Sequence, residues 1–157
     1  MKVKKLNKKL AILLEGDPIL KIPCEPIEEV TTELQTLAFN MCSTMIRSEG
    51  IGLAANQIGR SIQLLVVDTI YNEMGGVSAI MFNPKLLKGE GSITTQEGCL
   101  SLPNKRIEVE RYSRIEVEYT NIQNKCIIRE FKGLAAIAIQ HELDHLQGIT
   151  LSDKEQK

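Results

Sequence analysis

Two histidines near the end of the chain have the spacing of metal ligands. His141 and His145 lie four residues apart in the stretch QHELDHL (140–146), and the chain has no other histidine. On a helix, residues four apart project from one face with Cβ atoms about 5–6 Å apart, which suits two imidazoles on one metal ion. Glu142 follows the first histidine, where its carboxylate can reach water on that metal. This HExxH pattern predicts a helical metal site with a carboxylate for proton transfer.

A catalytic site of this kind usually has three protein ligands and one open position. The longer pattern HExxHxxGxxH fits as far as Gly148, but its third histidine position holds Leu151. Twelve residues follow His145, too few for the patterns that place a glutamate ligand further downstream. The third ligand is therefore expected upstream. Cys99 is the best candidate, because a coordinating cysteine is a thiolate and accepts soft or borderline divalent ions.

Three stretches of the chain, in this order, resemble the motifs of the peptide deformylases. They are GIGLAANQ (50–57), EGCLSLP (97–103) and QHELDHLQG (140–148), and together they span about two thirds of the chain. HExxH alone has many chance matches, whereas all three motifs in order are specific. The resemblance implies a hydrolase that removes the formyl group from N-formylmethionine at the start of newly made polypeptides and releases formate.

The resemblance also implies a metal and a general acid–base. Cys99, His141 and His145 would bind one divalent ion, Fe²⁺ natively, with Zn²⁺, Ni²⁺ or Co²⁺ able to replace it. The metal would lower the pKa of a bound water so that it attacks the formyl carbon. Glu142 would accept the proton of this water and later deliver it to the leaving amine.

Further roles for the oxyanion and the peptide follow from the same resemblance. The Gln57 side-chain amide and the Leu100 backbone N–H would stabilise the oxyanion. Glu97 is expected to orient the site, and Asp144 to pair with Arg111, although helical spacing alone leaves that carboxylate solvated. The peptide would lie strand-like beside the site. The residues expected at the substrate are Ile51, Gly52, Glu97, Arg106, Leu134, Ile137 and Ala138.

Hydrophobic periodicity predicts two helices and a set of strands. The early helix begins at a capping box of Thr32 and Gln35 and stops near Gly50, and the late helix begins at Gly133. The apolar stripe of the early helix includes Ile46. Strands with one early and one late helix indicate an α+β domain, and the resemblance implies antiparallel β-sheets around a central metal-bearing helix. The expected strands are 62–67, 77–82 after a Gly75–Gly76 turn and closed by Asn83–Pro84, 107–112, 115–119 and 126–131.

Composition narrows the class of protein. With 157 residues, 43% hydrophobic and 25% charged, the chain is expected to form one domain over 1–157. A formal net charge of −1 favours neither nucleic acid nor an anionic membrane, and no segment is apolar enough to span a bilayer. We expect a monomer in the cytoplasm, bacterial in type; a virus-encoded or organellar form fits the same pattern. Without an export signal, Cys24, Cys42 and Cys126 are expected to be structural thiols.

Two features depart from the family pattern. Asn56 stands where proline or threonine is commoner, which is expected to shift the loop while keeping the chemistry of Gln57. Many bacterial deformylases continue beyond the position of Lys157 into a long C-terminal helix. We therefore expect activity with altered stability or partner binding, and no ribosome docking through that helix.

Three alternatives remain at this point. A metallopeptidase that cleaves internal bonds is disfavoured by Leu151 and by the EGCLS motif, which such a protease does not need. A metal-stabilised module that binds peptide N-termini without turnover would need neither Glu142 nor Gln57. A structural metal is the third alternative, but three protein ligands beside a glutamate favour an open, catalytic site.

Overall fold

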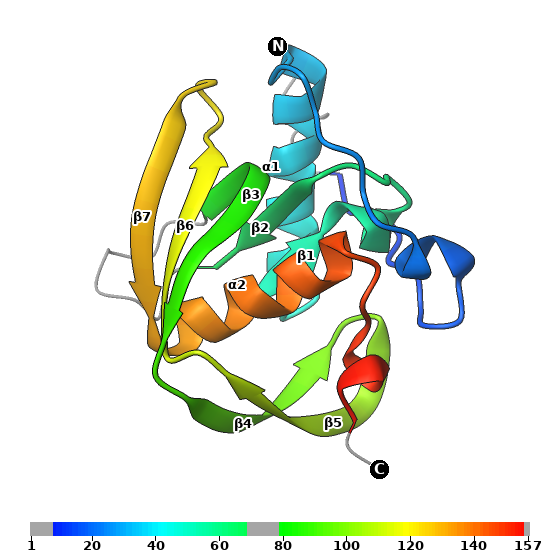
Figure 1. Cartoon of the computed structure of the whole chain (residues 1–157). Helices are drawn as coiled ribbons and strands as arrows, with labels where there is room; N and C mark the ends of the chain where they lie inside the picture. Colours follow the sequence, from blue (N-terminus) through cyan, green and yellow to red (C-terminus); the bar gives the residue numbers. More distant parts are fainter. Residues whose placement is uncertain (1–7, 69–78, 156–157) are drawn as a thin grey trace.

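The computed structural model describes residues 8–68 and 79–155, and in these residues its main element is a five-stranded antiparallel sheet (Figure 1). Its strand order is β1-β2-β3-β6-β7. The strands are β1 (Gly52–Ala54), β2 (Leu64–Val67), β3 (Ala79–Glu90), β6 (Arg114–Thr120) and β7 (Cys126–Lys132). Two further strands, β4 (Ile93–Cys99) and β5 (Leu102–Arg111), form a separate antiparallel hairpin.

The two helices pack on opposite faces of the large sheet. α1 (Thr32–Arg47) shares a core with Leu64 and Val66, whereas α2 (Gly133–Leu146) shares a core with Leu65 and Val67. Successive side chains of a strand point to opposite faces, so the short run LLVV supplies both cores. Because both faces are covered, all four residues of β2 are buried.

α2 lies at the centre of the molecule. In Figure 1 this helix runs between the large sheet and the β4–β5 hairpin, followed by the short 3₁₀ turn η4 (Leu151–Lys154). Leu151 of η4 packs with Ile107 and Val109 of β5 in a third, smaller core. The hairpin carries the EGCLS motif at the end of β4, so its packing beside α2 brings that motif next to His145.

The predicted fold class is confirmed. The chain is α+β, with antiparallel sheets and a central helix that begins at Gly133 as expected. The first helix differs in its details: Thr31, not Thr32, is its N-cap and accepts a hydrogen bond from the Leu34 N–H. The helix ends at Arg47, and Ile46 is 58% exposed, so the buried apolar stripe ends at Met45, one residue earlier than predicted.

The predicted end of a strand at Asn83–Pro84 is wrong. β3 continues through these residues to Glu90, with a register shift between Phe82 and Lys85 where it pairs with β6. Asn83 has a positive φ of 48°, and its side chain exchanges two hydrogen bonds with the backbone of Ile27. A bulge tolerates proline inside a strand, because the ladder hydrogen bond that proline lacks is already interrupted there.

Two strands were missed by the sequence analysis, and one predicted turn lies outside the described residues. Neither β1 nor β4 was among the expected strands, because β1 has only three residues and the sequence of β4, ITTQEGC, shows no alternation of apolar and polar residues. The predicted Gly75–Gly76 turn lies in 69–78, outside the described residues. Among the described helices, none has the length and apolar character to cross a membrane.

Candidate metal centre

Three potential metal donors converge beside α2. Cys99 comes from the end of β4, and His141 and His145 come from successive turns of α2. The donor atoms all lie within 4.8 Å of one another: Cys99 Sγ is 3.4 Å from His145 Nε2, which is 3.2 Å from His141 Nε2. The sequence-predicted ligand set is thus one cluster, and it includes the upstream cysteine that no local spacing could place.

The cluster fits a single divalent ion. His141 and His145 are 8% and 1% exposed, and both point Nε2 toward the same space. Burial lowers the pKa of His145 to about 3, and the charge of neighbouring His141 adds to this effect. Burial also opposes a charge on His141, but the hydrogen bond to Cys99 and the nearby carboxylates outweigh it and raise its pKa to about 10. His141 therefore carries one proton more than a neutral ring, and a cation that displaces this proton would find two neutral imidazoles and the Cys99 sulfur as donors.

Glu142 lies next to the cluster and is 3% exposed. Its Oε2 is buried and has no hydrogen-bond partner among the described residues, while Oε1 lies 3.9 Å from His141 Nε2. Burial raises the pKa of this carboxyl to about 7, partly opposed by the positive charges of His141 and Arg111. A Cβ added at Gly52 would lie 2.7 Å from Glu142 Oε1, so only glycine lets β1 approach this closely.

Gln57 extends the site on the side of Cys99. It is 1% exposed and stands in the 3₁₀ turn η3 (Ala55–Ile58), directly after β1. Its Oε1 accepts the Ala54 N–H at 2.9 Å, and its Nε2 donates to Ser101 Oγ at 3.0 Å and lies 3.7 Å from Cys99 Sγ. The amide N–H end is thereby directed at the EGCLS loop. Sequence reasoning did not single out Ser101, although its place two residues after Cys99 was an available clue.

A cavity of about 710 Å³ opens beside the three candidate ligands. Cys99, Leu100 and His141 line it, so the cavity reaches both ligand-bearing elements. Ile51 and Leu134 are 36% and 40% exposed, which leaves apolar surface available to a ligand. All residues predicted at the substrate lie in its wall: Ile51, Gly52, Glu97, Arg106, Leu134, Ile137 and Ala138.

A chain of ion pairs supports the cluster from behind. Glu97 Oε1 lies 3.0 Å from His141 Nδ1, and both Glu97 oxygens accept hydrogen bonds from Arg111, at 2.8 and 2.9 Å. Arg111 also donates to Asp144 at 2.6 Å, as the resemblance implied. Burial disfavours the Glu97 charge, but Arg111 and His141 outweigh it and lower its pKa to about 2. Glu97 therefore stays ionised and fixes the orientation of the His141 ring.

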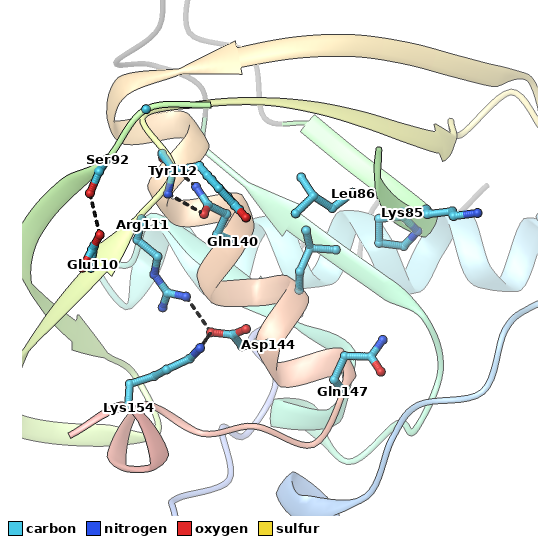
Figure 2. Close-up of a pocket in the computed structure, with 13 residues that line it drawn as sticks. Lys85, Leu86, Ser92, Glu110, Arg111, Tyr112, Gln140, Asp144, Gln147 and Lys154 are labelled. Atoms are coloured by element: carbon cyan, nitrogen blue, oxygen red, sulfur yellow. Dashed lines mark hydrogen bonds and ion pairs between the residues drawn. The ribbon is translucent and has the colours of Figure 1, made fainter. Parts of the chain in front are cut away.

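The far side of α2 lines a second cavity of about 640 Å³ (Figure 2). Here Asp144 lies between Arg111 and Lys154, whose Nζ is 3.6 Å away. Gln140 is held by the backbone of Tyr112, donating to its carbonyl at 2.9 Å and accepting from its N–H at 3.0 Å. No signal in the sequence indicated this second cavity or the contact of Arg111 with Glu97.

Comparisons with known proteins agree with the site. The model of the polypeptide deformylase family matches residues 9–157. A peptide deformylase of Aquifex aeolicus is 40% identical over 144 residues, covering 91% of this chain and 85% of the relative. One of Thermodesulfovibrio yellowstonii is 44% identical over 138 residues, covering 88% and 84%.

Solved structures give the same result. The crystal structure of peptide deformylase from Thermotoga maritima superposes with a TM-score of 0.87 at 34% identity and covers 96% of this chain and 99% of that one. A probable peptide deformylase from Synechococcus phage S-SSM7 gives 0.86 at 39% identity, with 93% and 99% covered. By sequence, by fold and by the cluster of a thiol, two imidazoles and a carboxyl, this chain belongs to the polypeptide deformylase family.

Proposed function

We propose that this chain deformylates N-formylmethionyl peptides at the cluster of Cys99, His141 and His145. One observation carries the assignment of these residues: their donor atoms lie within 4.8 Å of one another, beside a Glu142 oxygen that has no hydrogen-bond partner in the described part of the chain. A structural site would have no use for an unpaired buried carboxylate, which is costly unless a reaction requires it. When bound there, a divalent ion supplies Lewis-acid chemistry, lowering the pKa of water and polarising the formyl oxygen.

Glu142 moves the proton in the proposed reaction. Its carboxylate accepts a proton from the attacking water as the water oxygen bonds to the formyl carbon. The carbon–nitrogen bond then breaks, formate leaves, and the proton passes from Glu142 to the amine nitrogen. One water is consumed, and formate and a free N-terminal amine are formed.

Gln57 and Leu100 stabilise the charge that develops on the formyl oxygen. The Gln57 Nε2 group is held near Cys99 by its neighbours, so it is preorganised as a donor, and the Leu100 backbone N–H comes from the same loop as Cys99. Glu97 keeps the proton of His141 on Nδ1, which leaves Nε2 free for the metal.

The substrate's first residue fits the apolar part of the cavity. Ile51, Leu134, Ile137 and Ala138 would surround the methionine side chain, and the backbone at Gly52 would pair with the peptide. Arg106 at the rim, now donating to the Gln96 carbonyl at 3.3 Å, would contact the peptide further along.

The finer details of the function are also proposals. We propose Fe²⁺ as the native ion, as the resemblance to the family implies; a thiolate with two imidazoles accepts it, and accepts zinc, nickel and cobalt as well. We further propose that the protein acts as a monomer in the cytoplasm on nascent chains. Metal analysis after purification without oxygen tests the identity of the ion, and a measurement of solution mass tests whether the protein is a monomer.

The test of the function is formate release from a formyl-Met peptide by iron- or nickel-loaded protein purified without oxygen. We expect rapid release by the parent and a loss of about 10²–10⁴-fold in Glu142→Gln, with unchanged metal content, because general acid–base catalysis contributes about that much. Glu130→Gln, an exposed carboxylate on β7, is the matched control and should keep full activity. Cleavage of internal bonds instead of formate release would indicate a metallopeptidase, and no product from folded, metal-loaded protein would indicate a binding module.

A further inference from the structure

The 3₁₀ turn η3 contacts both elements that supply the proposed ligands. Gln57 reaches the loop of Cys99, as described above, and the preceding residue, Asn56, reaches α2. Asn56 is fully buried, and its Nδ2 donates a 2.7 Å hydrogen bond to the backbone carbonyl of His145, 89 residues away in the sequence. Two adjacent side chains thus join the turn to the ligand-bearing loop and to the ligand-bearing helix.

The carbonyl that Asn56 contacts lies in the last turn of α2. Carbonyls at the end of a helix have no intrahelical partner and leave the last turn free to fray unless other donors bind them. The His145 carbonyl accepts the Gly148 N–H at 3.0 Å as well as the Asn56 amide, so both of its lone pairs are used. The backbone of His145 is therefore fixed in position by a contact from another part of the fold.

The same two residues each carry one unpaired polar atom. Asn56 Oδ1 and His145 Nδ1 are both buried and have no hydrogen-bond partner among the described residues. His145 Nε2 faces Cys99 Sγ and His141 Nε2, so a neutral ring that binds a metal through Nε2 carries its proton on Nδ1. The unpaired atoms are then an acceptor on Asn56 and a donor on His145. An apolar residue could fill this position without leaving an unpaired acceptor, so packing alone gives no reason for an amide.

We infer that Asn56 is a positioning residue for the metal: through the His145 carbonyl it holds the last turn of α2 and keeps the His145 imidazole aligned with Cys99 and His141. The inference rests on the proposed role of His145 as a ligand. Its consequence is that loss of the Asn56 amide weakens metal retention, while the three ligands themselves stay in the chain. Partners one step beyond the ligands of a metal typically change its affinity by about 10–100-fold when they are removed.

The test compares Asn56→Leu, which has a similar size but no amide, with Thr44→Val as control. Thr44 is equally buried; its hydroxyl accepts a hydrogen bond from the Leu10 N–H and donates one to the Asn40 carbonyl, but it stands on α1, which supplies none of the proposed ligands. Each protein is loaded with Co²⁺, its visible absorption spectrum is recorded, and the rate of metal loss to an excess of chelator is measured.

We expect Asn56→Leu to lose cobalt about 10–100-fold faster than the parent and to show altered cobalt absorption bands. Thr44→Val should match the parent in both readouts, even though it is less stable to urea. Equal rates and spectra for Asn56→Leu and the parent would overturn the inference. If Asn56→Leu does not fold, Asn56→Ala, which removes the donor without adding bulk, is measured in its place, and parent-like metal retention there would count equally against the inference.

His145→Ala separates this inference from the proposed metal site itself. If the parent binds one cobalt per chain and His145→Ala does not, the site stands and the Asn56 result decides the inference alone. If His145→Ala retains cobalt with the spectrum of the parent, the proposed ligand set is wrong and the inference falls with it.

Discussion

The two faces of α2 differ in how well their buried polar groups are hydrogen-bonded. On the face toward Cys99, Glu142 Oε2 and His145 Nδ1 are buried without a hydrogen-bond partner among the described residues. On the face toward the second cavity, Gln140 is bound by the backbone of Tyr112, and Asp144 pairs with Arg111 and Lys154 (Figure 2). Unpaired buried groups are unfavourable, so they persist where a reaction or a ligand uses them, whereas paired groups hold the helix in place.

Ligand loss tests this contrast most strongly. His145→Ala should reduce metal affinity by more than about 100-fold, beyond the effect typical of a supporting residue, and should abolish formate release. Gln147→Ala, an exposed change on the opposite face, should leave both unchanged. Metal analysis and the formate assay measure the two effects. Equal losses in the two variants would show that the faces do not differ in function.

Arg111→Leu tests whether the paired groups on the face of α2 toward the second cavity, called the supporting face below, hold the helix in place. This arginine is 7% exposed and makes two hydrogen bonds to Glu97, so its removal leaves the buried Glu97 carboxylate with His141 alone as a partner. We expect a loss of about 3–5 kcal/mol in the free energy of unfolding of the metal-free protein, measured with urea. The control is Arg114→Leu, whose pair with Glu130 is exposed and should be worth about 0–1 kcal/mol. A similar small loss for both arginines would contradict a supporting role for the buried pair.

Asp144→Asn sharpens the comparison within the supporting face. The amide oxygen can still accept from the charged Arg111, so the ion pair becomes a hydrogen bond to a neutral acceptor, and we expect a loss of about 1 kcal/mol. Metal affinity should stay within a few-fold of the parent, because Glu97 still holds His141. Urea unfolding and competition with a chelator give the two values. A tenfold weaker metal affinity would instead mean that Asp144 acts on the metal site through Arg111.

The smallest effect is expected from the ion pair of Lys21 with Asp153, which holds η4 in place. Hydrogen bonding to Lys21, then to Thr150, lowers the pKa of Asp153 below its usual 3.8. A carboxyl with a lowered folded-state pKa adds stability above its unfolded pKa and loses it as the pH falls through the folded pKa. The melting temperature of Lys21→Met should therefore lie slightly below that of the parent near neutral pH.

This difference should narrow below about pH 4, where the carboxyl takes up a proton. Both side chains of the pair are partly exposed, at 54% and 39%, so solvent screens the effect. Comparing the two proteins at each pH in the metal-free form cancels the titration of the metal site. A difference that stays constant or widens toward low pH would mean that the pair does not stabilise η4 in this way.

Local spacing accounts for what the sequence alone determined. The helical period places His141 and His145 on one face and Asp144 away from it, so the HExxH reading and the start of α2 at Gly133 followed directly. The order of the three motifs indicated the family, and the period-2 and helical patterns indicated the α+β class. That the chain forms one domain over 1–157 stays a prediction.

Tertiary structure decided the contacts that no local period encodes. Cys99 meets His145 across 46 residues because the β4–β5 hairpin packs beside α2, and Asn56 reaches the same histidine across 89. The bulge that carries β3 through Asn83–Pro84 depends on a partner strand and on the Ile27 backbone, so the local rule that proline ends a strand failed there. Spacing along the chain fixes which face of a helix a residue occupies, but only packing between distant segments fixes what that face meets.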